Sequence, residues 1–343
     1  MAEKPAKKSA KKGASKAASN KTAATMGAPG LPADLKQALA KMLQSMNGGE
    51  PVPPQDLDAL LHSLQNLTPE NGVSDEKADA RFRAQELAFS AMEAATRTEA
   101  IKLSKRAVRL DPDCVDALVL LARLESPSQR AMIQGLQKAV AAGERSLGDD
   151  FIRQNTGHFW LHLDTRPYMR ALEVLAGELA RAGILRDAIA IYERMLVLNP
   201  NDNQGVRDPL LGLCLQAGDL AQASALLNRY DDASANFAWG RVLERFLAGD
   251  LPGAAAALVP AQRANRFLAL YLTGERPIPQ SNPEMYSLGS EEEAVLCMSW
   301  VGKAWSRNKE AIFWLHDQLA QSHKTAPSKA ALRKVPARGK HVN

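Results

Sequence analysis

The sequence contains few of the features on which disulfide scaffolds and membrane spans depend. Its three cysteines, Cys114, Cys214 and Cys297, are far apart, odd in number and each set in an apolar helical context. This pattern predicts buried, reduced thiols and a cytoplasmic location. No apolar run approaches the length of about 18 residues that a membrane helix needs, so we expect no membrane span. No apolar segment follows the basic N-terminus, so we expect no secretory signal.

Motifs of the common enzyme classes are also lacking. There is no glycine-rich phosphate loop ending in Lys-Ser/Thr, no Gly-x-Ser-x-Gly elbow and no Cys-x-x-Cys pair. We therefore expect no enzymatic activity and no cofactor. His158 and His162 stand four residues apart and raise the hypothesis of a metal site, but no third strong ligand follows at motif spacing. The alternative is that Phe159 and Trp160 pack this segment against the fold.

Aromatic residues make up only 5% of the chain, whereas apolar residues of all kinds make up 45%. Alanine and leucine dominate, which suits closely packed helices. Glycine and proline cluster at segment joints, and no stretch shows sustained alternation of β-branched residues. These patterns predict an all-α fold.

The net charge of +5 is unevenly distributed. Residues 1–24 carry seven lysines and one glutamate, and residues 324–343 carry six basic residues and no acid, so the remainder is acidic by −7. Such lysine-rich ends cannot bury enough apolar surface to fold, and we predict disordered tails at 1–30 and 323–343. Two hypotheses stay open for them: sequence-independent binding of nucleic acid or another anionic surface, and solubilisation of the chain.

The strongest positive pattern is a helix-hairpin repeat at residues 171–200. Small residues, one aromatic residue and a closing proline follow the spacing of a tetratricopeptide (TPR) unit: Ala176, Gly183, Ala188, Tyr192 and Pro200. The small residues allow two helices to approach, and the proline ends the second helix. Less regular copies begin near Arg81, Val115, Asn203 and Ala233, and residues 147–164 interrupt the period.

These repeats predict five regions. They are a disordered tail (1–30), a short helical hairpin with a linker (31–75), a TPR-like solenoid (76–270), a C-terminal helical cap (271–322) and a second disordered basic tail (323–343). The cap contains Trp300, Trp305 and Trp314, which we interpret as core residues, the alternative being a ligand platform. A solenoid needs such a segment because its last repeat has no following neighbour.

Four runs make the resemblance more specific than a generic repeat: Gly157–Trp160, Thr165–Arg170, Asn199–Arg207 and Tyr230–Asp232. Through them the stretch from about Ala80 to Leu315 resembles bacterial TPR proteins related to the suppression-of-tumorigenicity family. The resemblance implies a helical-repeat fold and no assigned catalytic chemistry. Asp208-Pro209 departs from it, because a hydrophobic or aromatic helix residue is expected there.

The candidate binding site consists of polar residues at groove positions of two adjacent repeats: Arg166, Arg170, Asn203, Gln204 and Arg207. In a TPR unit, positions 2, 5 and 9 of the first helix face the concave groove. Arg170 takes position 2 of one repeat, and Gln204 and Arg207 take positions 2 and 5 of the next. Guanidinium groups bind carboxylates through paired charge-assisted hydrogen bonds. The site is therefore a candidate clamp for an acidic segment or a C-terminal carboxylate.

A structural alternative explains the same residues. Asn201, Asp202 and Asn203 would cap the next helix, and the arginines would pair with nearby acids of the chain, namely Asp164, Asp202 or Asp208. Taken together, the sequence predicts a non-catalytic scaffold or adaptor that binds a protein or peptide segment. The other hypotheses are association with nucleic acid through the basic tails and, third, a metal-dependent enzyme.

Overall fold

The computed structural model describes residue 41, residues 76–230 and residues 232–325. The chain divides into two compact units, residues 1–57 and 58–343, and the described residues from 76 onward belong to the second. The predicted tail 1–30 and nearly all of the predicted hairpin 31–75 and of the tail 323–343 lie outside the described residues.

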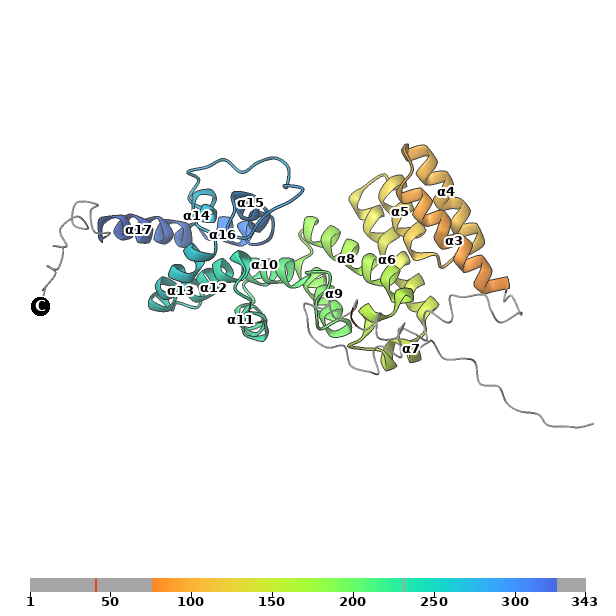
Figure 1. The fold of residues 1–343 in the computed structure, drawn as a ribbon, viewed down its shortest axis with the longest axis horizontal. Helices are drawn as coiled ribbons and strands as arrows, with labels where there is room; N and C mark the ends of the chain where they lie inside the picture. The colour runs from red at the N-terminus through yellow and green to blue at the C-terminus, as the bar shows by residue number, and fades with distance from the viewer. Residues whose placement is uncertain (1–40, 42–75, 231, 326–343) are drawn as a thin grey trace, which may run out of the picture. The chain divides into compact units, whose positions relative to one another are not determined.

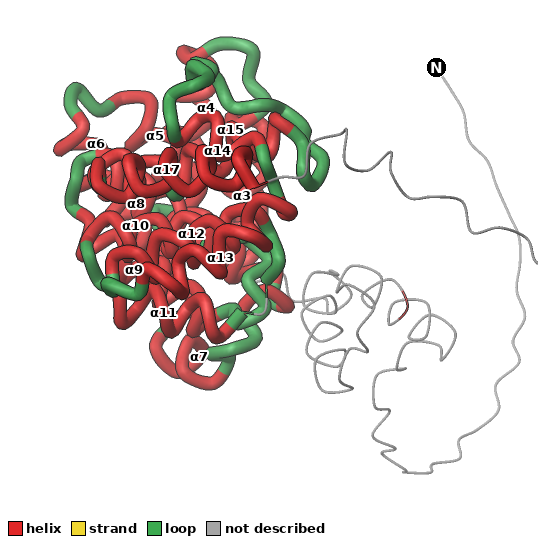
Figure 2. The backbone as a smooth tube through the Cα atoms, turned by 90° about the vertical axis from the view of Figure 1, so that its left-hand side faces the viewer, coloured by secondary structure: helices red, strands yellow, loops and turns green. Residues whose placement is uncertain are grey.

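The described part of the chain is entirely helical and contains no β-strand (Figure 2). Two 3-10 helices, η1 (Phe159–Leu161) and η2 (Leu163–Thr165), accompany fifteen α-helices. With the labels of Figure 1 these are α3 (Glu76–Met92), α4 (Arg97–Leu110), α5 (Val115–Glu125), α6 (Gln129–Leu147), α7 (Asp149–Gln154), α8 (Arg166–Arg181), α9 (Leu185–Leu198), α10 (Arg207–Ala217), α11 (Leu220–Arg229), α12 (Ala235–Leu247), α13 (Leu251–Ala264), α14 (Phe267–Leu272), α15 (Glu291–Trp300), α16 (Gly302–Arg307) and α17 (Lys309–Thr325). None of the described helices is long and apolar enough to cross a membrane.

Most helices pack against the next helix in the chain. The pairs α3/α4, α5/α6, α8/α9 and α12/α13 are joined by short connections, and short connections make neighbouring helices antiparallel (Figure 1). The first helices of the early pairs also touch one another, since α5 contacts both α3 and α8. A row of three first helices therefore runs through the N-terminal part of this unit.

The pair α8/α9 shows how the sequence specifies such a hairpin. Ala176 and Ala188 are fully buried and let the two helices approach, as predicted. Gly183 has φ of 78°, a left-handed conformation that glycine adopts without a steric penalty, and it ends α8. The next amide, of Ile184, donates to the Leu179 carbonyl and closes the turn. The phenol ring of Tyr192 is buried beside these small residues.

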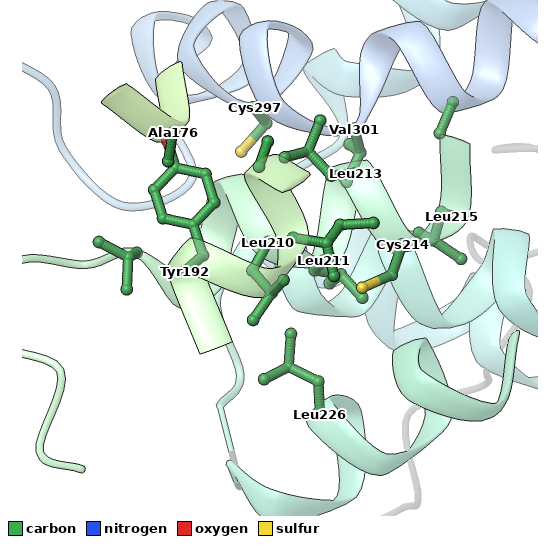
Figure 3. Packing of buried hydrophobic residues seen from close by; sticks show 14 of the residues in the cluster. Ala176, Tyr192, Leu210, Leu211, Leu213, Cys214, Leu215, Leu226, Cys297 and Val301 are labelled. Carbon is green, nitrogen blue, oxygen red and sulfur yellow. The ribbon is translucent and has the colours of Figure 1, made fainter. Parts of the chain in front are cut away.

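Helix α10 departs from this pattern because it is covered on every side. Six consecutive residues, 210–215, are buried, and six residues span more than one and a half helical turns. α9 and α11 pack on α10 from its neighbours in sequence, and α12, α15 and α16 also contact it. Figure 3 shows the α10 side chains between Leu226 on one side and Cys297 and Val301 on the other.

The segment predicted as a C-terminal cap supplies that cover. α15 and α16 lie against α10, and α15 and α17 also contact α12. Trp305 of α16 is fully buried, and its ring meets that of Trp239 edge to face, with 6.3 Å between the ring centroids. Trp300 and Trp314 are partly buried and pack against the same core. All three cysteines are free and buried, as the sequence predicted.

Candidate functional site

The best-defined polar contact among the first helices joins α3, α5 and α8. Asp116 of α5 accepts hydrogen bonds from Arg170 of α8, at 3.1 Å from Nε and 2.6 Å from Nη2. The same carboxylate accepts a hydrogen bond from Gln85 Nε2 of α3 at 2.7 Å. Asp116 is only 2% exposed, so these three bonds replace the water that its charge has lost. We call these three residues the Asp116 relay.

The hydrogen bonds of the Asp116 relay show which residues of α3, α5 and α8 lie on the same face. In α3, α5 and α8 a buried alanine, Ala88, Ala122 or Ala176, marks the same place in each predicted repeat. Six residues before these alanines stand Phe82, Asp116 and Arg170, and Asp116 and Arg170 are in contact. Arg170, which stands at a predicted groove position, and Asp116 therefore hold equivalent places on α8 and α5.

Arg166 lies one turn before Arg170 on α8 and has a different environment. Its guanidinium stands over the Trp160 ring, 4.8 Å from the ring centre, and donates to the Trp160 carbonyl at 3.4 Å. No carboxylate pairs with Arg166 within the described residues, and its Nε is buried without a hydrogen-bond partner there. Burial, and then the nearby charge of Arg170, lower the pKa of Arg166. Arg170 is therefore paired with a carboxylate, whereas the neighbouring Arg166 contacts only Trp160 within the described residues.

Gln204, which precedes α10, contacts α8. Its Nε2 donates to Glu173 Oε2 at 2.7 Å, while its Oε1 is buried without a partner in the described part of the chain. Burial is the main cause that raises the pKa of Glu173. Asn203 is exposed. Of the two predicted amide side chains, only Gln204 is therefore engaged with the helix that carries Arg170.

Arg207 belongs to another cluster. Its Nη2 lies 2.9 Å from Asp232 Oδ2 and its Nε 3.9 Å from Asp202 Oδ2. Its guanidinium also stands over the Tyr230 ring, 5.2 Å from the centre. Asp202 adopts a left-handed φ of 51° and accepts hydrogen bonds from the backbone amides of Val206 and Arg207. The structure thus places the predicted arginines in two groups, Arg166 with Arg170 and Arg207 apart, and gives Asp202 the capping contacts of the structural alternative.

The start of α10 carries one further, partly buried acid. Asp208 accepts a hydrogen bond from Asn236 Nδ2 of α12 at 2.8 Å. Burial raises the pKa of Asp208 to about 6. Pro209 is in the first turn of α10, where its missing amide donor is harmless, so the helix begins normally at the point where the sequence departs from the resemblance.

The two histidines of the metal hypothesis differ in exposure. His162 is buried with its ring edge-on to Phe151, at 5.4 Å between centroids, and His158 is exposed. Phe159 is fully buried, and its ring centre lies 6.3 Å from that of Tyr168. In residues 76–230 and 232–325 no group of three or more His, Cys, Asp or Glu side chains is placed to hold a metal ion.

Sequence reasoning missed an apolar surface on α3. Phe82, Phe89 and Met92 are 59%, 45% and 46% exposed, although alanines on another face of the same helix are fully buried. The signal was present as a second apolar stripe with spacings of seven and three residues. The sequence analysis did not identify this stripe because the repeat pattern is defined by the small residues of α3, not by its phenylalanines. We call these three residues the α3 stripe.

Comparison of the sequence with protein-family models and with curated proteins gives no match.

Proposed function

We propose that this chain is a non-catalytic scaffold or adaptor of the TPR type, resembling the bacterial TPR proteins named above. It binds an acidic segment or a terminal carboxylate of another protein on the face formed by α3, α5 and α8. In this proposal the paired helices form a solenoid, and this face is the open part of its concave groove. We place the binding site on α3, α5 and α8 because α10, farther along the chain, is already covered by α15 and α16.

The observation that carries the proposal is that the Arg166 guanidinium, beside the Asp116 relay, has no ion-pair partner within the described residues. Arg166 and Arg170 lie one turn apart, and of the acids on this face only Asp116 pairs with either of them. The Arg166 guanidinium stacks on the Trp160 ring, and this contact limits the number of side-chain conformations of Arg166 before a ligand binds. A guanidinium that is already held in place loses less entropy when it binds a carboxylate.

The three predicted arginines therefore have different roles. Arg166 is the group that meets the ligand carboxylate. Arg170 holds the relay and adds positive potential, and Arg207 stabilises the Asp202–Asp232 cluster. Replacing Arg207 would test folding and not binding, so the informative variant is Arg166→Gln.

The experiment selects binders from a displayed library of random peptides on the immobilised full-length chain. Enriched peptides are then synthesised in pairs that differ only by Glu against Gln, and with a free or an amidated C-terminus. We expect the carboxylate form to bind about tenfold more tightly, which is about the value of one charge-assisted hydrogen bond. Arg166→Gln should remove that preference while leaving the binding of the neutral peptide unchanged.

A matched control is Arg194→Gln on α9. The Arg194 guanidinium also lies over an aromatic ring, that of Tyr168, and pairs with Glu144 at 3.0 Å. This variant should keep the carboxylate preference. Failure to enrich any peptide, or an equal preference in wild type and Arg166→Gln, would contradict the proposed function.

A further inference from the structure

A cavity with a volume of about 490 Å³ lies between α11, α12 and α13. The three helices follow one another in the chain, and α12 contacts both α11 and α13 (Figure 1). The walls of the cavity are largely apolar and include Leu227 of α11, Phe237 of α12, and Ala257 and Pro260 of α13. Small molecules bind to proteins in cavities of about 300 to 1,000 Å³. The cavity therefore has room for the apolar body of a small ligand.

Two arginines from different helices also line this cavity, Arg241 of α12 and Arg263 of α13. The hydrogen bond of 3.0 Å from Trp239 Nε1 to the Asn265 carbonyl sets residue 239 at the level of residue 265. Because the two helices are joined by a short connection and run antiparallel, the same register sets residue 241 at the level of residue 263. The two guanidinium groups can therefore act on one ligand group.

Neither of these guanidiniums is paired with a carboxylate in the described part of the chain. Arg241 donates to two neutral acceptors, Asn228 Oδ1 at 2.9 Å and the Leu227 carbonyl at 2.7 Å. These bonds satisfy a carbonyl in the last turn of α11 and hold the guanidinium in place, while its other N–H groups stay available. Arg263 is exposed and has no hydrogen-bond partner among residues 76–230 and 232–325.

The acid that lines the cavity, Asp232, is already matched by another arginine. Its Oδ2 lies 2.9 Å from Arg207 Nη2, and its Oδ1 accepts a hydrogen bond from the Ser234 amide at 2.8 Å. Asp231 lies outside the described residues, and when its full charge is counted here the two cavity arginines still exceed it by one. The other acids of this region pair with Arg245: Glu244 and Asp250. The cavity therefore carries a net positive charge.

We propose that this cavity binds a small organic anion with an apolar body and a carboxylate, such as a medium-chain fatty acid. The apolar body packs against Leu227, Phe237 and Ala257, and the carboxylate accepts hydrogen bonds from Arg241 and Arg263. Guanidinium groups bind carboxylates through paired charge-assisted hydrogen bonds, and Arg241 is already held in place, which lowers the entropy cost of binding. The limited volume selects a small molecule over a peptide segment, which needs a longer groove.

This inference goes beyond the proposed function, because it concerns another ligand and none of its residues belongs to α3, α5 or α8. The test measures the binding of three probes to the full-length chain by isothermal titration calorimetry, at concentrations well below those at which the probes form micelles. Octanoate has both features of the ligand, octanamide has the apolar body without the charge, and acetate has the charge without the body. We expect octanoate to bind at least about tenfold more tightly than either of the other two.

Three variants test the two parts of the site separately. Arg241→Gln and Arg263→Gln should each weaken octanoate binding, by about tenfold in the first variant, and leave octanamide binding unchanged. Ala257→Leu fills the cavity while both arginines remain, and it should weaken the binding of octanoate and of octanamide alike. Thermal unfolding followed by circular dichroism checks that the variants keep the fold.

A matched control is Arg266→Gln. Arg266 is exposed like Arg263 and follows it by three residues, but it lies over the Phe267 ring, 5.0 Å from the ring centre, and does not line the cavity. This variant loses the same charge from the same region and should bind octanoate as wild type does. A loss equal to that of Arg263→Gln would show a general attraction of anions and overturn the site.

A photoreactive octanoate that carries a diazirine locates the bound ligand by mass spectrometry. Labels on residues 227–241 and 257–264 support the site, and labels only elsewhere overturn it. Equal affinities for octanoate and octanamide, or an unchanged octanoate affinity in both cavity-arginine variants, also overturn it. An acetylated peptide that ends in a leucine carboxylate, binds more tightly than octanoate and loses affinity in Arg241→Gln would assign the cavity to a protein C-terminus and overturn the small-molecule ligand. Because Arg166 takes no part in this site, all these outcomes leave the proposed function to its own test.

Discussion

Gly212 of α10 lies directly against the backbone of Trp300, at the end of α15. A Cβ added at position 212 would lie 2.7 Å from the Trp300 carbonyl carbon, closer than packed atoms allow, and that neighbour is backbone that cannot swing away. A glycine inside a helix costs up to about 1 kcal/mol relative to alanine. Its presence here is explained by the close approach of α15 and α16 to α10.

Gly212→Ala should therefore destabilise the fold, by about 2–3 kcal/mol, because overpacking outweighs the gain in helix propensity. Gly177→Ala is the matched control. It is also inside a helix, but the nearest atoms to its added Cβ would be 3.9 Å away, an ordinary contact. That variant should be neutral or slightly more stable. Urea denaturation of both variants measures the difference, and equal effects would contradict the packing described for α10.

The two buried tryptophans should respond differently to the same substitution. Trp239 Nε1 donates to the Asn265 carbonyl at 3.0 Å, whereas Trp305 Nε1 is buried without a partner in the described residues. Trp239→Phe removes a hydrogen bond and leaves a buried carbonyl without its donor. Trp305→Phe removes an N–H group that had no partner. We expect Trp239→Phe to cost about 1 kcal/mol more in chemical denaturation, and the reverse order would contradict this account.

The Asp116 relay predicts an asymmetric double-mutant cycle. Arg170→Met leaves a buried carboxylate with Gln85 as its remaining partner, which should cost about 3 kcal/mol of unfolding free energy. Asp116→Asn should cost less, about 1 kcal/mol, because the freed Arg170 side chain is 40% exposed and can be hydrated. The combined variant should recover much of the loss of Arg170→Met. Strictly additive effects in denaturation would show that the pair is not coupled.

The raised pKa of Asp208 gives stability a defined pH dependence. In the folded chain this carboxyl has a pKa of about 6, whereas in the unfolded chain its pKa is about 3.9. The folded state therefore binds the proton more tightly, and the stabilising contribution of Asp208 falls as pH rises from about 4 to about 6. Asp208→Asn removes this loss, and the introduced amide can donate to Asn236 Oδ1, which is buried without a partner in the described residues.

Relative to wild type, Asp208→Asn should become more stable across that pH range, by an amount on the order of 2–3 kcal/mol. Thermal or urea denaturation of both proteins at pH 4, 5, 6 and 7 measures the change. A stability difference that stays constant from pH 4 to pH 7 would contradict the burial of this carboxylate.

The helical fold was predictable because its signals are local. The spacing of Ala176, Gly183 and Ala188 predicts a helical hairpin, and α8 and α9 occur where that spacing placed them. The partners of the arginines were not predictable. Arg170 binds Asp116, 54 residues earlier, and no local pattern connects the two.

The sequence also could not predict the surroundings of Arg207 and of the α3 stripe. The sequence placed Arg170 and Arg207 at groove positions 2 and 5 of neighbouring predicted repeats, but in the structure Arg207 follows the left-handed Asp202 and pairs with Asp232. The exposed α3 stripe was visible as a pattern of apolar residues, yet its exposure depends on which helices are near it. Such information comes only from the arrangement in space.

The enclosure of α10 has a consequence for the order in which this protein forms. From α3 to α9 each helix packs on near neighbours in sequence, so structure can grow along the chain as it leaves the ribosome. The surroundings of α10 are complete only when α15 and α16 arrive, and the hydrogen bond from Arg307 to the Gln216 carbonyl closes a separation of 91 residues. Such distant contacts form slowly. A nascent chain that ends before residue 290 would therefore expose leucines of α10, and we expect chaperones that recognise apolar segments to bind there during synthesis.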